Sequence, residues 1–232
     1  GNLFSQTSWQ WQNPIPTASN LFDVQMFDNN TFYMCGNGGT IIKTTDAGQN
    51  WILQESYTEE TLFALYFINT LTGWAVGSDD KGIIRKTTNG GNNWFAQTSP
   101  QLYALRDVVF LNENTGYIAA SGKVLKTTNS GVNWVEQSTP TSAVYLSISF
   151  VNENTGWAAG TSGIIIRTTN GGATWESQPS GHDKIIWSVY MLDANNGYAA
   201  GQYGYILKTT NGGINWTKPA SNWTGMYLKN IC

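Results

Sequence analysis

The chain contains the eight-residue stretch Thr87-Thr88-Asn89-Gly90-Gly91-Asn92-Asn93-Trp94, and this stretch decides how the rest of the sequence is interpreted. Four variants of it end at Trp51, Trp134, Trp175 and Trp216. Successive Trp positions differ by 43, 40, 41 and 41 residues, so the sequence is a tandem repeat. A repeat of this length indicates an array of small and similar structural units.

Each repeat contains the patterns of four short strands. In the third copy these strands are predicted at residues 105–110, 116–120, 123–128 and 134–137. The glycine-rich stretch between the third and fourth strands supplies the positive φ angles that a tight hairpin needs. Small sheets that are apolar on both faces can bury them only against neighbouring sheets. The sequence therefore predicts an all-β fold, a β-propeller of four-stranded antiparallel blades.

We expect residues 1–232 to form a single propeller domain of five complete repeats of about 41 residues. The predicted blades are 21–54, 62–98, 104–138, 144–179 and 185–219. Residues 9–14 match a fourth strand, and residues 227–232 match a first strand. We expect an excerpt of a longer ring, or self-association through the incomplete blades. A ring that the two partial strands close together is the remaining alternative.

Composition excludes several classes of function. The 12 Lys and Arg residues and the net charge of −3 cannot provide the basic surface that a nucleic acid requires. No apolar run is long enough to cross a bilayer, so membrane insertion is not expected. The two cysteines, Cys35 and Cys232, lack the spacing of a metal site. We expect neither a metal nor a cofactor.

The repeated turns resemble Asp boxes, which are also called BNR repeats. The frame Leu105-x-Asp107-Val108-x-Phe110, followed by Gly116-Tyr117-x-Ala119, resembles the propeller family of the photosystem II stability/assembly factor. The opening Trp9-Gln10-Trp11-Gln12-Asn13-Pro14 resembles the mature start of secreted relatives from the Bacteroidetes group, which type IX secretion often exports. This resemblance implies a secreted bacterial protein, extracellular or at the cell surface, whose signal peptide is already removed.

The Asp-box residues are predicted to be structural. The Asp or Asn is expected to accept backbone N–H groups within the turn, while the Trp ring packs beneath it. These pairs are Asp46 and Trp51, Asn89 and Trp94, Asn129 and Trp134, Asn170 and Trp175, and Asn211 and Trp216. Four of the five boxes carry neutral Asn, which is a weak calcium ligand, so calcium sites are not expected. The equal spacing of the five box Trp residues predicts that they contribute similarly to stability.

No catalytic set can be assembled with certainty from the sequence. A sialidase-like site requires three arginines, and the chain has only Arg85, Arg106 and Arg167. Arg167 occupies a slot that holds Lys in the other copies, which indicates a framework role. Paired carboxylates of a glycosidase stay conceivable at Glu59, Glu60, Asp79, Asp80 and Asp183. We therefore expect no enzyme activity and keep a glycoside hydrolase as an alternative.

One position on the first strand varies strongly between copies, whereas framework positions keep similar residues. In propellers this strand lines the central channel, and the loops that share its face usually bind ligands. The predicted ligand-binding residues at the mouth of the channel are Phe22, Phe63, Arg106, Trp187, Tyr203, His182 and Trp223. Aromatic side chains with few charges suit a sugar or a peptide. The alternative is that these side chains only pack the inner strands.

The leading hypothesis is a secreted, non-catalytic propeller that serves as a recognition or scaffold module in a larger extracellular protein. Its expected partner is a protein or a carbohydrate. The first alternative is a glycoside hydrolase. The second, which the family resemblance implies, is a chaperone of photosystem assembly.

Overall fold

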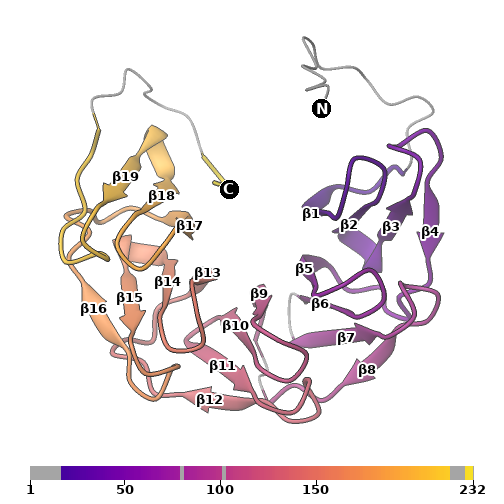
Figure 1. Ribbon diagram of the computed structural model, residues 1–232, viewed down its shortest axis with the longest axis horizontal. Helices are drawn as coiled ribbons and strands as arrows, with labels where there is room; N and C mark the ends of the chain where they lie inside the picture. Colours follow the sequence, from indigo (N-terminus) through magenta and orange to yellow (C-terminus); the bar gives the residue numbers. More distant parts are fainter. Residues whose placement is uncertain (1–16, 79–80, 101–102, 220–227, 232) are drawn as a thin grey trace.

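The computed structural model describes residues 17–78, 81–100, 103–219 and 228–231. These residues form five antiparallel sheets arranged as an arc (Figure 1). Residues of the innermost strand of every sheet line one cavity at the centre of the arc, which we call the channel. The sheets follow one another in chain order, and one side of the arc is open. The predicted class, an all-β propeller with antiparallel blades, is confirmed. The described residues contain no helix with the length and apolar character of a membrane span.

Each sheet is a blade whose strands run outward in sequence order, and we number the blades 1 to 5 along the chain. The inner strands are β1 (Leu21–Met26), β5 (Leu62–Phe67), β9 (Leu105–Phe110), β13 (Tyr145–Phe150) and β17 (Ile186–Met191). The second strands are β2 (Phe32–Gly36), β6 (Gly73–Gly77), β10 (Gly116–Ala120), β14 (Gly156–Gly160) and β18 (Gly197–Gly201). The third strands are β3 (Ile41–Thr44), β7 (Ile83–Thr87), β11 (Lys123–Thr127), β15 (Ile165–Thr168) and β19 (Ile206–Thr209).

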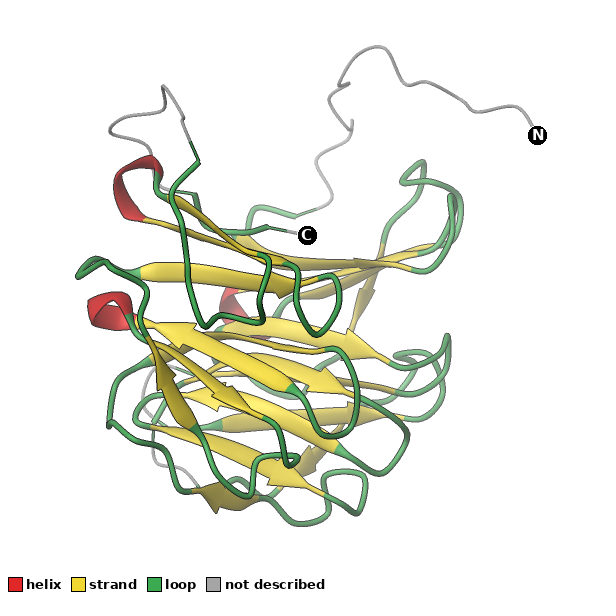
Figure 2. Cartoon of the chain, turned by 60° about the vertical axis from the view of Figure 1, so that its left-hand side comes forward, coloured by secondary structure: helices red, strands yellow, loops and turns green. Residues whose placement is uncertain are grey.

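The outermost strands are β4 (Ile52–Gln54), β8 (Phe95–Gln97), β12 (Val135–Gln137) and β16 (Glu176–Gln178). Blade 5 has three strands, and a single bridge between Lys208 and Thr217 marks the place of its fourth. Three 3-10 turns join second to third strands: η1 (Asn37–Gly39), η2 (Thr161–Gly163) and η3 (Gln202–Gly204). They lie on the same side of the arc (Figure 2).

The Asp-box turns are closed by their own side chains. In blade 2 the Asn89 Oδ1 accepts the Thr87 hydroxyl at 3.0 Å and the Asn93 backbone N–H at 2.9 Å. The Thr87 hydroxyl oxygen also accepts the Gly91 N–H at 3.0 Å. Gly91 has a φ of +86°, and a Cβ there would lie 2.3 Å from the Gln54 Oε1 of blade 1. Glycine is favoured at this position by the backbone angle, and a Cβ would also displace the end of the Gln54 side chain.

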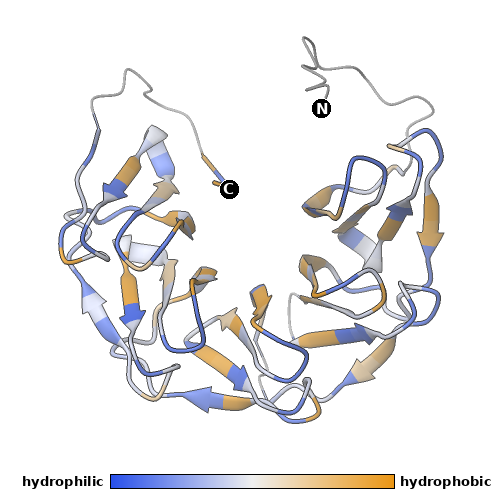
Figure 3. Cartoon of the chain, viewed as in Figure 1, coloured by the Kyte–Doolittle hydropathy of each residue, from blue (hydrophilic) through white to orange (hydrophobic). Residues whose placement is uncertain are grey.

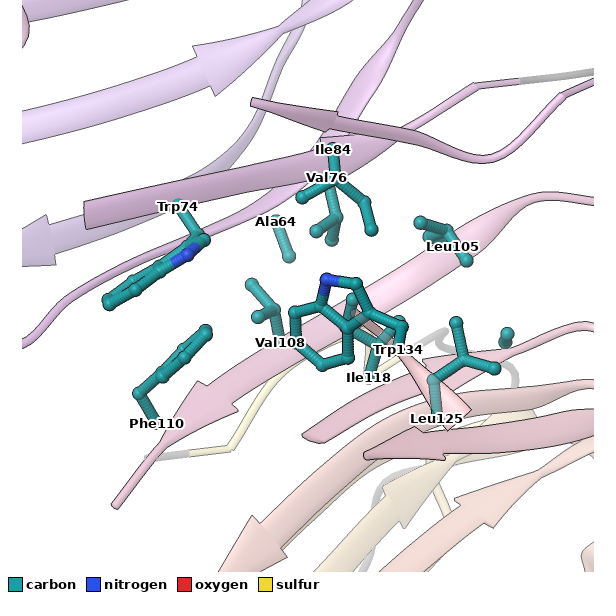
Figure 4. Packing of buried hydrophobic residues seen from close by; sticks show 11 residues of the cluster. Ala64, Trp74, Val76, Ile84, Leu105, Val108, Phe110, Ile118, Leu125 and Trp134 are labelled. Carbon is teal, nitrogen blue, oxygen red and sulfur yellow. The ribbon is translucent and has the colours of Figure 1, made fainter. Parts of the chain in front are cut away.

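The hydrophobic core lies between the blades. Between blades 2 and 3, the Trp74 and Phe110 rings stack with centroids 3.5 Å apart, and Trp134 meets Phe110 edge-on at 5.8 Å (Figure 4). The inner strands are largely coloured hydrophobic in Figure 3, as burial from both sides requires. Gly116 makes the stacking possible, since a Cβ there would lie 2.6 Å from the Phe110 ring.

A second contact joins consecutive blades near the outside of the ring, and we call it the aromatic–cation pair. It consists of an aromatic residue on the second strand and a Lys or Arg on the third strand, and both lie next to the Asp-box turn of the following blade. In blade 3 the Tyr117 hydroxyl and the Lys126 Nζ donate to the Gly171 carbonyl of blade 4, at 2.8 and 2.7 Å. The Lys126 Nζ also lies 5.4 Å from the Tyr117 ring centroid.

The same pair recurs at each joint between described blades. Tyr33 and Lys43 donate to the Gly90 carbonyl, and Trp74 and Lys86 donate to the Ser130 carbonyl. At the joint of blades 4 and 5, the Trp157 Nε1 donates to the Gly212 carbonyl at 3.1 Å. Arg167 takes the place of Lys there, with its Cζ 5.1 Å from the Trp157 ring centroid. A framework role for Arg167 follows from this position.

The box tryptophans are not equivalent, because Trp51 of blade 1 is only partly buried while Trp134 is buried. We expect Trp134→Ala to lower the free energy of unfolding by about 3–5 kcal/mol, and Trp51→Ala to lower it by clearly less. Urea unfolding followed by circular dichroism measures both values. Equal losses would show that burial of the ring is not what the box Trp contributes.

Candidate ligand-binding site at the channel mouth

Three side chains on successive inner strands form a continuous row at the channel mouth. Phe22 of β1 lies against Phe63 of β5, with ring centroids 5.6 Å apart. The guanidinium of Arg106, on β9, lies over the same Phe63 ring, with its Cζ 4.3 Å from the centroid. Phe22 is 47% exposed, so the row presents an open aromatic surface. We call Phe22, Phe63 and Arg106 the mouth row.

A β-bulge at the start of each inner strand positions the row. Leu21 pairs with Gly36 and Asp23 with Cys35, so Phe22 lies between two paired residues and has no partner of its own. The register shifts at the same place in the other blades, and the bulged residues there are Phe63, Arg106, Leu146 and Trp187. A bulge redirects a side chain without breaking the sheet. The position can therefore vary in type while the blade keeps its structure.

The predicted site residues do not form one site. Trp187 lies on β17, two blades beyond Arg106, and its Nε1 finds no hydrogen-bond acceptor among the described residues. Tyr203 lies in η3 with a φ of +58° and is half exposed. Trp223 lies outside the described residues. The structure brings together Phe22, Phe63 and Arg106 and leaves the others apart from that row.

His182 belongs to a separate cluster on blade 5. Its ring meets the Tyr205 ring edge-on, with centroids 3.8 Å apart. The Lys218 Nζ lies 4.2 Å from the centroid of the Tyr205 ring. The His182 Nδ1 accepts the Lys184 backbone N–H at 2.8 Å. Burial lowers the pKa of His182, so the neutral ring is favoured and the side chain serves to hold its own loop.

Beneath the mouth row, polar side chains of blades 1, 3, 4 and 5 bind the inner segment that follows each of these blades. Each accepts the backbone N–H of a residue on the following inner segment. We call these side chains the channel acceptors: Asp23 accepts Leu65 at 2.9 Å, Asp107 accepts Ile148 at 2.8 Å, Ser147 accepts Val189 at 3.2 Å, and Ser188 accepts Ile231 at 3.2 Å. Ala64 occupies the equivalent position in blade 2 and cannot accept.

Sequence reasoning did not single out the channel acceptors as a group. The signal was present, because the position after the variable one holds Asp, Asp, Ser and Ser in four copies. Their partners are backbone groups of the next blade, about 42 residues away. Only the side-by-side arrangement of the inner strands shows that such an N–H lies within reach.

The channel acceptors line a cavity of about 610 Å³. Burial, together with the charge of the nearby Asp23 carboxylate, raises the pKa of Asp107 to about 7. The pKa of Asp23 is also raised by burial. The Asp107 Oδ1 accepts the Val108 N–H and its Oδ2 accepts the Ile148 N–H, both at 2.8 Å. Both oxygens are therefore engaged by backbone, as in a structural carboxylate.

The other carboxylates considered from the sequence lie apart from the channel acceptors where the structure describes them. Glu59 and Glu60 border a separate hollow of about 650 Å³ beside η1. Asp183 makes an ion pair with Lys184 at 3.0 Å. Asp79 and Asp80 lie outside the described residues. The part of the chain that the structure describes also holds no group of three His, Cys, Asp or Glu suited to a metal ion.

The three arginines lie in different settings. Arg85 donates from Nη2 to the Tyr57 carbonyl at 2.6 Å, between blades 1 and 2. Arg106 lies in the mouth row and Arg167 in an aromatic–cation pair. A carboxylate clamp needs the three to converge, and they do not.

The repeated blades, the Asp-box turns and the channel together define an Asp-box β-propeller. The family model described as photosynthesis system II assembly factor YCF48 matches residues 2–137 and 126–222. The chain belongs to this family. No curated protein matches it by sequence.

Solved structures show the same fold at low sequence identity. YCF48 bound to D1 peptide is 18% identical with a TM-score of 0.61, over 88% of this chain and 82% of that one. YCF48 from Cyanidioschyzon merolae is 18% identical with a TM-score of 0.58, over 89% of this chain and 86% of that one. The GH74 xyloglucanase from Xanthomonas campestris is 13% identical with a TM-score of 0.65, over 84% of this chain but only 37% of that one.

Asp107 should make stability depend on pH. Its pKa rises from 3.8 to about 7 on folding, so the folded state binds more protons than the unfolded state between these values. The free energy of unfolding therefore falls as pH rises through this window. We expect Asp107→Asn, which cannot ionise, to flatten that fall in urea unfolding measured from pH 4 to pH 8.

Asp193→Asn is the matched control, because Asp193 is exposed and hydrogen bonds within its own turn lower its pKa. The stability that ionised Asp193 contributes is lost only as pH falls through its lowered pKa. The Asp193→Asn variant should therefore still lose stability as pH rises from 4 to 7, as the original chain does. An unchanged slope in Asp107→Asn would show that this carboxyl is ionised throughout the window.

Proposed function

We propose that this protein is a non-catalytic binding propeller that holds an extended segment of another protein across the mouth row. The observation that carries the proposal is the contact of Phe22, Phe63 and Arg106 on three successive blades. Each side chain is placed by a bulge, so the row stands on a rigid frame.

The chemistry of the row favours a peptide. Exposed aromatic faces bind apolar side chains with little loss of side-chain entropy. The Arg106 guanidinium, held over Phe63, adds a positive charge that attracts a carboxylate or a peptide carbonyl. A solved relative, YCF48, binds a D1 peptide, which supports a peptide as the class of ligand. We further propose that binding takes place outside the bacterial cell or at its surface, because Trp9 to Pro14 resemble a segment of secreted relatives.

Two other functions are consistent with the family and the fold. Structural likeness to GH74 enzymes favours a glycoside hydrolase, for which Asp23 and Asp107 in the channel are the available carboxylates. Backbone N–H groups engage both oxygens of each residue, which speaks against proton transfer to a substrate. The family description favours a photosystem assembly factor, and a peptide-binding mouth row would serve that role equally.

The test is a screen of the purified chain against an array of random dodecapeptides and a glycan array. We expect peptides to bind, and Phe63→Ala to weaken the best peptide by about 10-fold or more while the melting temperature changes little. Arg106→Gln should weaken acidic peptides most. Fluorescence titration of labelled peptides measures each affinity.

Phe95→Ala is the matched control, because Phe95 is an exposed phenylalanine that lies on the outer strand β8. It should leave affinity unchanged. Loss of binding in Phe95→Ala would move the site to the rim. Turnover of chromogenic glycosides that disappears in Asp107→Asn would replace the proposal with the hydrolase.

A further inference from the structure

Five asparagines in the chain are followed directly by glycine, and such a step is chemically labile. The backbone nitrogen of the glycine can attack the side-chain amide of the asparagine, because glycine has no side chain to hinder the approach. Asparagine is a thermolabile residue for this reason, and its reactivity depends on how firmly the backbone is held. The five steps begin at Asn37, Asn89, Asn170, Asn196 and Asn211.

Three of these steps lie in Asp-box turns, where the glycine nitrogen is already engaged. In each turn the glycine N–H donates at 2.8 Å to a carbonyl in the loop between the first and second strands of the same blade. The Asn Oδ1 accepts a Thr hydroxyl and a backbone N–H of its own turn. The box asparagines can therefore react only when their turns open. The donor and acceptor residues are Gly90 and Leu71, Gly171 and Asn154, and Gly212 and Asn195.

The step from Asn196 to Gly197 lies at the start of β18. Gly197 pairs with Met191 on β17 and with Thr209 on β19, so its backbone belongs to the sheet. The Asn196 Nδ2 donates to both carboxylate oxygens of Asp193, at 3.2 and 2.9 Å. Sheet pairing and the bonded amide together hold this step in place.

The step from Asn37 to Gly38, in η1, differs from the other four. Gly38 is exposed, and its N–H has no acceptor among the described residues. A Cβ at Gly38 would meet no atom within 4 Å apart from its chain neighbours, so nothing packs over the glycine. The Asn37 N–H donates to the Asn20 carbonyl at 3.0 Å, and the Asn37 carbonyl accepts the Thr40 N–H at 3.1 Å. The attacking nitrogen is thus exposed to water while the residue that carries the amide is fixed.

The turn itself does not require this labile step. The equivalent turns η2 and η3 have Ser162 and Tyr203 at the place of Gly38, with φ angles of +57° and +58° compared with +62°. The same backbone conformation therefore forms with side chains other than glycine. Among the three η turns, the step is particular to blade 1.

We propose that Asn37 is a site of spontaneous covalent modification, at which the amide is converted to aspartate or isoaspartate in the folded protein. The Gly38 nitrogen bonds to the Asn37 Cγ, and the Cγ–Nδ2 bond breaks. The leaving group takes up the proton of the Gly38 N–H and departs as ammonia. Water then opens the resulting five-membered ring at either of its two carbonyls. The Thr61 hydroxyl, which donates to the Asn37 Oδ1 at 3.4 Å, stabilises the negative charge that develops on this oxygen during the attack.

The modification changes the charge beside the mouth row. The hollow next to η1 is bordered by Glu59 and Glu60, and the new carboxylate adds a further negative charge there. It lies next to Thr61, two residues before Phe63. The Gly39 N–H donates to the Glu60 carbonyl at 2.8 Å. An isoaspartate lengthens the backbone by a carbon atom, so it also strains this link between η1 and the segment that leads into β5.

The experiment follows the purified chain during incubation at mildly alkaline pH. Peptide mapping by mass spectrometry measures conversion at each of the five steps, and labelling by isoaspartyl methyltransferase measures isoaspartate. We expect Asn37 to convert at nearly the same rate in the folded chain as in the chain unfolded by urea. The other four asparagines should convert about 10-fold or more slowly in the folded chain than in the unfolded chain, because their backbone must open first.

Two variants copied from η2 are the controls. Gly38→Ser should keep the melting temperature, because Ser162 has the same backbone angle, and should slow conversion of Asn37 several-fold, because the added side chain hinders the attack. Asn37→Thr copies Thr161 and should also keep the melting temperature. It should remove the fast phase of isoaspartate formation.

Two results would overturn the proposal. One is conversion of Asn37 in the folded chain that is as slow as that of the box asparagines. The other is fast conversion of all five asparagines in the folded chain, because the hydrogen bonds of the box turns would then not select the site.

Discussion

The hydrogen bonds from an aromatic–cation pair to the box-turn carbonyl of the next blade are the interaction on which this structure depends. A four-stranded blade is apolar on both faces and cannot be stable alone. Dispersion between faces would let blades slide over one another, whereas a hydrogen bond to one carbonyl sets their register. Tyr117 and Lys126 meet Gly171 in this way, and the turn can offer its carbonyl only because its own side chains close it.

The channel wall adds a second set of contacts at the opposite edge of each blade. The channel acceptors take backbone N–H groups from the following blade, so the joints after blades 1, 3 and 4 are held near the axis as well as near the rim. Joining blades through a carboxylate requires burying it, which explains the pKa of about 7 at Asp107. The serines at 147 and 188 make the same link without a charge. Such a frame holds the blades together while the bulged residues above it vary in type.

Repeated features were predictable from the sequence, whereas contacts between unlike residues were not. The spacing of the box Trp residues predicted five blades, and the hairpin turns placed the third and fourth strands close to their observed bounds. Phe22, Phe63 and Arg106 were identified because they vary where the frame repeats. That His182 belongs instead with Tyr205 could not be foreseen, because η3 brings these residues together from separate loops. Trp51 is less buried than the other box tryptophans, and nothing in the local sequence pattern predicts this difference.

The sequence by itself determined the unit: its strands, its turn chemistry and its two apolar faces, all of which depend on residues within about 41 positions of one another. The tertiary structure alone decided which unit meets which, because the partner of each polar group lies one blade away. It alone showed that Asp23 and Asp107 share a cavity, and that Phe22, Phe63 and Arg106 form a continuous row. Burial and electrostatic interaction depend on distance in space, which the order of residues along the chain does not state.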